Sequence, residues 1–424
     1  MLRFPVLLVC ACALALGAPL GVLALTQHPT SPAPRAELAV STRSAAPVTR
    51  NDLRIITHGK QWRRGTLRGV EPVGGSLRIS TPRRLHHEHG RTYEQSWWTS
   101  PWLSVATFSE LNPSWNASTP KGTFLIVRAR ARTAGGDHTS WQNLGRWASG
   151  WDTITRTSKG SQRDGMSSVS VDTLLADPGI RFDSYQLQVQ LLRKQGSTVT
   201  PTVGSVHAVS TLPGRVPQVS EPLLGARTLP VPAYSQMIHE GEYPQYGGGG
   251  EAWCSPTSLA MVLGYYDALP RHYGWVNKSY RDRFVDEVAR RVFDARYDGT
   301  GNWPFNTAYA ATRVQQAVVT RLSNLRGAER FIAAGIPLEV SISFSRGQLS
   351  GAPISSTPGH LVVIVGFTRS GDVVVNDPAA PTDATVRRTY DRAQFEAAWL
   401  RTSHGLAYAI RDKSHPFPTG VGLT

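Results

Sequence analysis

One cysteine in the C-terminal half of the chain has the surroundings of a reactive thiol. Cys254 follows four consecutive glycines, residues 247–250, and precedes Ser-Pro-Thr-Ser, after which apolar residues recur at helical spacing. The thiol is therefore expected at the N-terminus of a helix, where unpaired backbone N–H groups and the helix dipole favour the thiolate. Because the thiolate is the nucleophile, this position lowers the cost of attack on a carbonyl carbon.

A base for this thiol is expected at His360, which opens a strongly apolar run. An imidazole can take the thiol proton and return it to a leaving group. The next run, residues 372–376, pairs with the first through the turn at residues 369–371, so Asp377 at its end is expected beside His360. A carboxylate there fixes the imidazole tautomer and stabilises its cation. The three residues together predict a Cys–His–Asp triad.

Acyl transfer also needs hydrogen-bond donors for the developing oxyanion. Gln236, at the end of the segment Val231-Pro-Ala-Tyr-Ser-Gln, is the candidate side chain, and the Cys254 backbone N–H is the second donor. Gln245 is the alternative. The sequence leaves the choice open, because the geometry of the glycine loop between these residues is unknown.

The elements that must hold these residues are expected to be helices first and strands afterwards. Helical periodicity covers residues 256–268, 279–296, 306–319 and 326–334, and strand-like runs cover 337–342, 360–367 and 372–376. Helices followed by a sheet predict an α+β domain.

The preceding residues, 51–213, show short strands separated by turn signals. The clearest strands are residues 124–130 and 185–191, and the second alternates strictly between polar and apolar side chains. This pattern predicts an all-β sandwich or jelly roll. Eight tryptophans fall in this segment, and the alternatives for them are a sugar-binding platform or packing in the core and at its rim.

The chain is expected to divide into five parts. Residues 1–24 read as a secretory signal peptide, with a basic start, an apolar core and small residues at the end; an uncleaved anchor is the alternative. A flexible tether (25–50), the β-rich domain (51–213), a Pro-containing linker (214–230) and the C-terminal domain (231–424) follow. No later stretch is long and apolar enough for a membrane span. Cys10 and Cys12 leave with the signal, so Cys254 is expected as a lone free thiol of an exported protein.

The net charge of +15 favours anionic partners such as a cell-surface polymer, and a merely basic soluble surface is the alternative. No nucleic-acid motif accompanies the short arginine clusters. The segment His86-His87-Glu88-His89 is metal-like in composition, but no further ligand lies at a typical zinc spacing. We expect no metal and no cofactor.

Four segments resemble the C39-like peptidase family. They are Val231 to Gln236, Trp253 to Leu263, Gly359 to Phe367 and Val375 to Pro378, and the resemblance extends over about residues 231–412. It implies a papain-like fold with Cys254 as nucleophile, His360 as base, Asp377 as orienting residue and Gln236 in the oxyanion hole. The segments Ser100 to Leu103 and Leu144 to Gly150 resemble the β-sandwich that accompanies such domains in secreted actinobacterial proteins.

The sequence therefore predicts a secreted cysteine peptidase or amidase that hydrolyses a peptide or cell-wall amide. Two alternatives remain open. The C-terminal domain could be inactive and the chain a surface- or carbohydrate-binding protein, or the triad could serve acyl transfer, as in transglutaminase-like folds.

Overall fold

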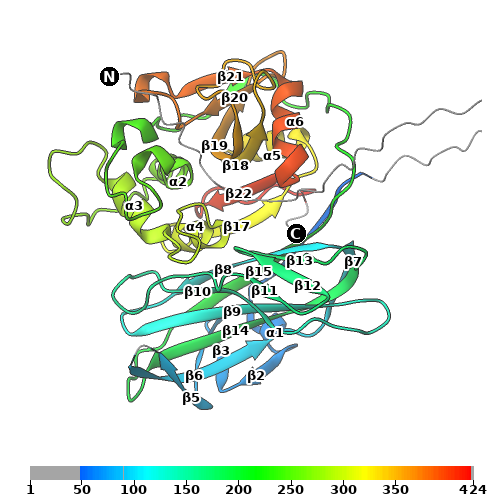
Figure 1. Ribbon diagram of the computed structural model, residues 1–424, viewed down its shortest axis with the longest axis vertical. Coiled ribbons are helices and arrows are strands. Elements are labelled where there is room, and N and C mark those ends of the chain that lie inside the picture. Colours follow the sequence, from blue (N-terminus) through cyan, green and yellow to red (C-terminus); the bar gives the residue numbers. More distant parts are fainter. Residues whose placement is uncertain (1–47, 89, 422–424) are drawn as a thin grey trace, which may run out of the picture.

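The computed structural model describes residues 48–421 except residue 89, and these form two units stacked on one another (Figure 1). The lower unit in that view holds two β-sheets, and the upper unit holds a third sheet with helices around it. The predicted signal peptide and almost all of the predicted tether lie outside the described residues.

The first sheet has eight strands in the order β11-β12-β13-β8-β15-β4-β3, with β1 paired to β15. Its strands are β1 (Arg50–Ile56), β3 (Val70–Val73), β4 (Ser76–Ile79), β8 (Glu110–Ser118), β11 (Gln162–Arg163), β12 (Ser167–Ser170), β13 (Thr173–Ala176) and β15 (Thr202–Leu212).

The second sheet has seven strands in the order β10-β9-β14-β6-β2, with β5 paired to β6 and β7 paired to β14. Its strands are β2 (Thr66–Arg68), β5 (Arg84–Glu88), β6 (Arg91–Thr99), β7 (Leu103–Phe108), β9 (Thr123–Arg132), β10 (Gln142–Trp147) and β14 (Phe182–Lys194). A single helical turn, α1 (Gly59–Trp62), joins the two sheets' first strands.

One apolar core lies between these two sheets. It takes Trp115 and Val206 from the first sheet and Val127 and Val189 from the second. The alternation read from residues 185–191 places Tyr185, Leu187, Val189 and Leu191 in this core, but the strand is not half-buried, because Gln186 and Gln190 on its other face are buried as well. The prediction of a β-rich N-terminal half is confirmed.

The third sheet belongs to the upper unit and has seven strands in the order β17-β22-β18-β19-β20-β21, with β16 paired to β19. Its strands are β16 (Arg227–Thr228), β17 (Gln316–Arg321), β18 (Leu338–Phe344), β19 (Thr357–Phe367), β20 (Val373–Asn376), β21 (Arg387–Tyr390) and β22 (Leu406–Arg411). The hairpin expected between residues 360–367 and 372–376 is the pair β19–β20. Strand β16 lies in the segment predicted as a linker, whose end thus adds an edge strand to this sheet.

Five α-helices and three short 3-10 helices among the described residues accompany this sheet. They are η1 (Gln236–His239), η2 (Gly250–Ala252), α2 (Cys254–Tyr265), α3 (Phe284–Val292), α4 (Trp303–Ala310), α5 (Leu325–Ala333), η3 (Asp383–Thr385) and α6 (Arg392–Ser403).

The helical prediction for residues 306–319 is wrong over its second half. Helix α4 ends at Ala310, and β17 begins at Gln316. Val318, Val319 and Thr320 are β-branched and fully buried, and β17 pairs with β22 near the C-terminus, so a long-range partner decides this segment. The prediction for 279–296 was too long at both ends, and neither α6 nor β22 was expected.

The two units share a packed interface. Phe305 of α4 enters the sandwich core, with its ring centroid 6.2 Å from that of Trp115. The Asn116 amide donates to the Ala317 carbonyl at 2.6 Å, and its oxygen accepts from the Ala317 N–H. Helix α4 and strand β17 therefore belong to both units, which favours one cooperative structure.

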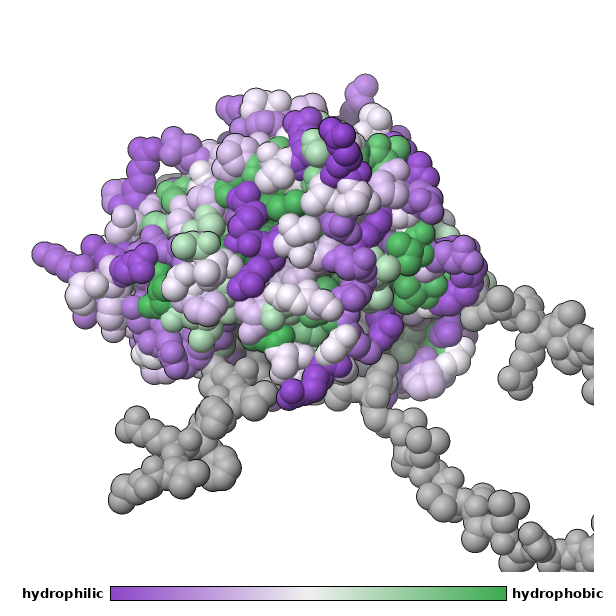
Figure 2. All heavy atoms as spheres, turned by 90° about the horizontal axis from the view of Figure 1, so that it is seen from above, coloured by the Kyte–Doolittle hydropathy of each residue, from purple (hydrophilic) through white to green (hydrophobic). Residues whose placement is uncertain are grey.

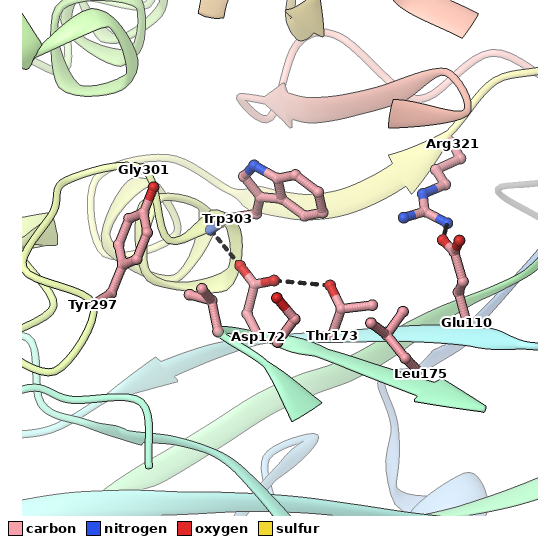
Figure 3. Close-up of a pocket in the computed structure, with 10 residues that line it drawn as sticks. Glu110, Asp172, Thr173, Leu175, Tyr297, Gly301, Trp303 and Arg321 are labelled. Atoms are coloured by element: carbon pink, nitrogen blue, oxygen red, sulfur yellow. Dashed lines mark hydrogen bonds and ion pairs between the residues drawn. The ribbon is translucent and has the colours of Figure 1, made fainter. Parts of the chain in front are cut away.

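A small apolar cavity at this interface contains two buried polar contacts (Figure 3). Asp172 points toward α4, where its Oδ2 accepts from the Trp303 N–H at 2.8 Å. Arg321 of β17 reaches Glu110 of β8. Each of these contacts joins a residue of the β-sandwich to a residue of the upper unit.

The face seen from above carries small groups of hydrophobic residues among hydrophilic ones (Figure 2). None of the helices within residues 48–421 is long and apolar enough to cross a membrane.

Candidate active site

Cys254 is the first residue of α2, as the sequence predicts. Its side chain is 2% exposed. Its N-cap residue, Trp253, makes no side-chain capping hydrogen bond, so the positive end of the helix dipole faces the thiol. Helix α2 packs against β19, and the Ser258 hydroxyl donates to the Leu361 carbonyl at 3.0 Å. This bond joins the thiol-bearing helix to the residue that follows His360.

The glycine run before Cys254 has a steric reason. Gly247, Gly248 and Gly249 have φ values of +74°, +98° and +104°, which residues with a side chain rarely adopt. A Cβ on Gly250 would lie 2.0 Å from the His239 carbonyl oxygen. The run thus turns the chain sharply and lets η2 pack on the backbone of η1 before the helix begins.

The structure brings His360 and Asp377 together. The His360 Nε2 lies 2.7 Å from Asp377 Oδ1, and both side chains are 1% exposed. His360 also hydrogen-bonds the Cys254 side chain. Because Nε2 contacts the Asp377 carboxylate, the hydrogen bond to the Cys254 sulfur involves the other ring nitrogen, Nδ1. Strand β19 begins at Thr357, three residues earlier than expected, so His360 lies within the strand.

Asp377 is held from three directions. Its Oδ1 accepts from the Ala379 N–H at 3.0 Å, its Oδ2 accepts from the Tyr390 hydroxyl at 2.7 Å, and its backbone N–H donates to the Val386 carbonyl. Tyr390 is fully buried and ends β21, the neighbour of β20. The carboxylate is therefore fixed before it orients the imidazole.

Charges in this group stabilise one another. Burial lowers the pKa of His360, but the Asp377 carboxylate and the Cys254 side chain raise it to about 10. Burial raises the pKa of Asp377, and the His360 charge and the hydrogen bonds from His360 and Tyr390 bring it below its usual value. At neutral pH the group therefore holds an imidazolium beside a carboxylate, a setting that favours a thiolate at Cys254.

Gln236, and not Gln245, lies next to this group. The Gln236 backbone N–H donates to the Pro378 carbonyl at 2.9 Å, beside Asp377, and its side-chain amide donates to the Glu251 carbonyl at 2.5 Å, three residues before Cys254. Gln236 is 3% exposed, whereas Gln245 is exposed on the turn before the glycines. Of the two amides, Gln236 is the one within the triad's surroundings.

A buried carboxyl that the sequence reasoning missed also lies near the thiol. Glu339 of β18 is fully buried and accepts from the Ser255 hydroxyl at 3.1 Å. Burial raises its pKa well above the usual value, and the Cys254 charge raises it further. Burial thus disfavours the charged form of Glu339 near the nucleophile. The sequence signal for Glu339 is that it is the only acidic residue in the apolar run 337–342. No comparable signal marks Tyr390.

The His86-His87-Glu88-His89 segment does not gather metal ligands in its described part. His86 Nε2 lies 3.1 Å from Glu88 Oε2, so these two share a face, but Arg146 pairs with the same carboxylate. His87 contacts the Thr92 hydroxyl instead. An arginine at the carboxylate disfavours a cation there.

The tryptophans of the β-sandwich serve mainly in packing. Trp62, Trp98, Trp115 and Trp147 are fully buried. Three others are half-buried and have guanidinium groups over their rings: Arg84 lies 5.1 Å from Trp97, Arg132 4.4 Å from Trp102, and Arg130 4.7 Å from Trp141. Trp151 is the exposed one, at 55%, and Arg290 stacks on it.

Both units of the chain match protein families. Residues 52–211 match the peptidase C39 N-terminal domain, a family defined on actinobacterial sequences, and residues 228–406 match the peptidase C39-like family. No curated protein matches the chain.

Solved structures show only remote likeness. The chain matches structures of infectious bursal disease virus, strains Gx and Gt, each with 11% identity and a TM-score of 0.21 over 43% of this chain. The matches cover 37% and 36% of the viral chains, so this chain spans little more than a third of their length. Likeness at this level carries no argument about function.

Proposed function

We propose that this chain, which belongs to the C39-like peptidase family and carries the actinobacterial-type N-terminal domain, is a papain-like cysteine hydrolase that cleaves amide bonds through Cys254, His360 and Asp377. The observation that carries the proposal is the buried chain of contacts from Tyr390 through Asp377 and His360 to Cys254. A structural role alone would not require a thiol, an imidazole and a carboxylate in this order at a helix N-terminus.

In the first half-reaction the Cys254 thiolate attacks the amide carbonyl carbon, and the electron pair of the carbonyl moves to its oxygen. The His360 imidazolium gives its proton to the departing amine nitrogen as the C–N bond breaks, which leaves a thioester on Cys254. In the second half-reaction the neutral imidazole takes a proton from water, and the hydroxide formed attacks the thioester. The acid product and the thiolate–imidazolium pair result.

The remaining groups orient and stabilise. Asp377 keeps the His360 ring in place and offsets its positive charge, and Tyr390 and the Ala379 N–H hold Asp377. The Gln236 amide and the Cys254 backbone N–H are the proposed oxyanion donors. One Gln236 N–H is used by the Glu251 carbonyl, so its second N–H is the one offered to the substrate.

We further propose that the substrate is a peptide or a cell-wall amide met outside the cell. The apolar N-terminal segment with its basic start supports export, and the net charge of +15 supports contact with an anionic cell-surface polymer. A peptidase delivered to the cell surface fits both features.

The test is incubation of the purified chain with peptide mixtures and with cell-wall fragments, followed by mass spectrometry. We expect products with new free acid and amine ends, absent for Cys254→Ser and for His360→Ala. Products linked to an added amine would instead assign the triad to acyl transfer. Binding to cell-wall material without any product, by both the parent chain and Cys254→Ser, would overturn the hydrolase in favour of a binding protein.

A further inference from the structure

Three metal-ligating side chains meet in the upper unit, apart from the triad. His239 ends η1, Glu242 lies in the turn that follows, and Asp286 belongs to α3. The His239 Nδ1 lies 2.8 Å from Glu242 Oε2 and 3.6 Å from Asp286 Oδ2, and one ligand atom from each residue falls within 4.8 Å of the others. Among the described residues, no other group of three such side chains lies this close.

Asp286 is the unusual member of this cluster. Its side chain is fully buried, and neither of its oxygens has a hydrogen-bond partner of ordinary geometry within the described part of the chain; the Glu242 carboxyl is the group that lies close enough to interact with it. A buried carboxylate without a donor is costly, and a second carboxylate beside it raises the cost. Arg283, the nearest basic residue along the chain, donates to the Tyr273 and Val276 carbonyls and pairs with neither acid.

We propose that His239, Glu242 and Asp286 bind a divalent transition-metal cation, with Zn²⁺ as the ion that suits them. A Zn²⁺ ion lies about 2.0–2.2 Å from nitrogen and oxygen ligands, which at the tetrahedral angle separates neighbouring ligand atoms by about 3.3–3.6 Å. The observed 3.6 Å matches that spacing, and the observed 2.8 Å requires His239 and Glu242 to move apart by less than about 1 Å. An imidazole in the set favours Zn²⁺ over Mg²⁺ and Ca²⁺, which prefer oxygen ligands only. The ion would supply the positive charge that the two carboxylates lack.

The cation would fasten the segment that leads to the triad. The element that ends at His239 begins at Gln236, and the His239 ring packs on Trp253, the residue before Cys254, with ring centroids 6.2 Å apart. Glu242 is 7% exposed and lies beside the exposed residues 240 and 241, which gives an ion a short path from solvent. A cation bound here would join η1 to α3.

The experiment uses the folded chain carrying Cys254→Ser, so that the active-site thiol cannot bind the metal. Titration with Zn²⁺ by calorimetry should show one tight site, and the melting temperature should rise in Zn²⁺. Asp286→Asn and Glu242→Gln should each weaken this binding at least tenfold. Asp282→Asn, which removes a nearby acid outside the cluster, should bind like the parent. In EDTA, Asp286→Asn should melt no lower than the parent, because it removes the unpartnered charge.

Three results would overturn the proposal. They are the absence of stoichiometric Zn²⁺ binding to the parent, equal binding by the parent and both cluster variants, or preference for Ca²⁺ over Zn²⁺. All readouts are binding and stability, so they do not depend on whether the chain hydrolyses amides.

Discussion

At the scale of single residues, the site works through a relay of fixed neighbours. Asp377 receives three hydrogen bonds, from His360, Tyr390 and the Ala379 N–H, so its carboxylate cannot rotate away from the imidazole. His360 in turn contacts the Cys254 thiol. The relay lies in a buried region where charge–charge attraction is strong, and burial raises the pKa of the nearby Glu339 carboxyl, which disfavours a second negative charge beside the thiolate.

Replacing Tyr390 by phenylalanine should reduce kcat/KM for peptide hydrolysis about tenfold without unfolding the chain. The change removes one donor to the Asp377 carboxylate, and a hydrogen bond to a charged group contributes about 1.5–3 kcal/mol. The matched control is Tyr265→Phe, which removes a hydroxyl that donates to the Gly335 carbonyl far from the triad. Equal kcat/KM for the two variants would remove Tyr390 from the relay.

The pH dependence of hydrolysis follows from His360. Its imidazolium gives a proton to the leaving amine, and Asp377 and Cys254 raise its pKa to about 10, so activity should persist to high pH and fall near pH 10. Asp377→Asn removes the main cause that raises this pKa, so the upper limb of the kcat/KM profile should move to lower pH. Asp412→Asn, which disrupts a separate His–Asp pair with His415, should leave the limb unchanged. An unmoved limb in Asp377→Asn would contradict the role of the carboxylate.

The sequence predicted those site residues whose positions depend on the local backbone. Cys254 at a helix start and Asp377 beside His360 follow from a local turn and one hairpin. Tyr390 and Glu339 depend instead on β21 pairing with β20 and on β18 packing under α2, which no short pattern encodes. The choice of Gln236 over Gln245 required the path of the glycine loop.

At the scale of elements, two backbone features position the catalytic side chains. One is the β19–β20 hairpin, which sets His360 against Asp377. The other is the glycine loop, which folds η2 onto η1 and delivers Cys254 to the start of α2. Helix α2 and strands β18, β19 and β20 were visible as periodic patterns, whereas β17, β21, β22 and α6 were not. In β17 the buried β-branched residues pair with a strand near the C-terminus, which no local pattern reveals.

Gly250→Ala should disrupt the second of these features. The added Cβ would lie 2.0 Å from the His239 carbonyl oxygen, so η1 and η2 must separate. Overpacking of this kind costs about 1–3 kcal/mol of unfolding free energy, and alkylation of Cys254 should change because the start of α2 shifts. Gly274→Ala is the control, since no atom lies within 4 Å of the Cβ it would add. Denaturant unfolding checks the prediction, and equal stability of the two variants would refute it.

At the scale of the whole molecule, the β-sandwich and the upper unit behave as one packed structure. Phe305 enters the sandwich core, Asn116 pairs with the backbone of β17, and Arg321 reaches Glu110. The β-sandwich therefore packs against α4 and β17, which lie on the side of the upper unit that faces it (Figure 1). Sequence patterns predicted the β-rich N-terminal half. They could not predict the contacts between the two units, because hydrophobic periodicity shows which face of an element is buried but not which other element covers it.

Asp172 gives this interface a measurable pH dependence. Burial raises its pKa to about 7, against the lowering effect of the Trp303 N–H and Thr173 hydrogen bonds. Between about pH 4 and 7 the unfolded chain ionises this group and the folded chain does not, so the group makes stability fall as pH rises. Asp172→Asn should abolish that component, on the order of 2–4 kcal/mol, while exposed Asp137→Asn should not. The measurement is the free energy of unfolding at pH 5 and at pH 8. The same difference between the two pH values in the parent, Asp172→Asn and Asp137→Asn would contradict the role of Asp172.

The central claim is that His360 and Cys254 form a thiolate–imidazolium pair, and alkylation of Cys254 at pH 6.5 tests it most directly. The parent chain should react with iodoacetamide faster than free cysteine does at that pH, because the nearby imidazolium stabilises the thiolate. In His360→Ala the rate should fall below that of free cysteine, with labelling still confined to Cys254. Equal rates for the parent and His360→Ala would contradict the claim.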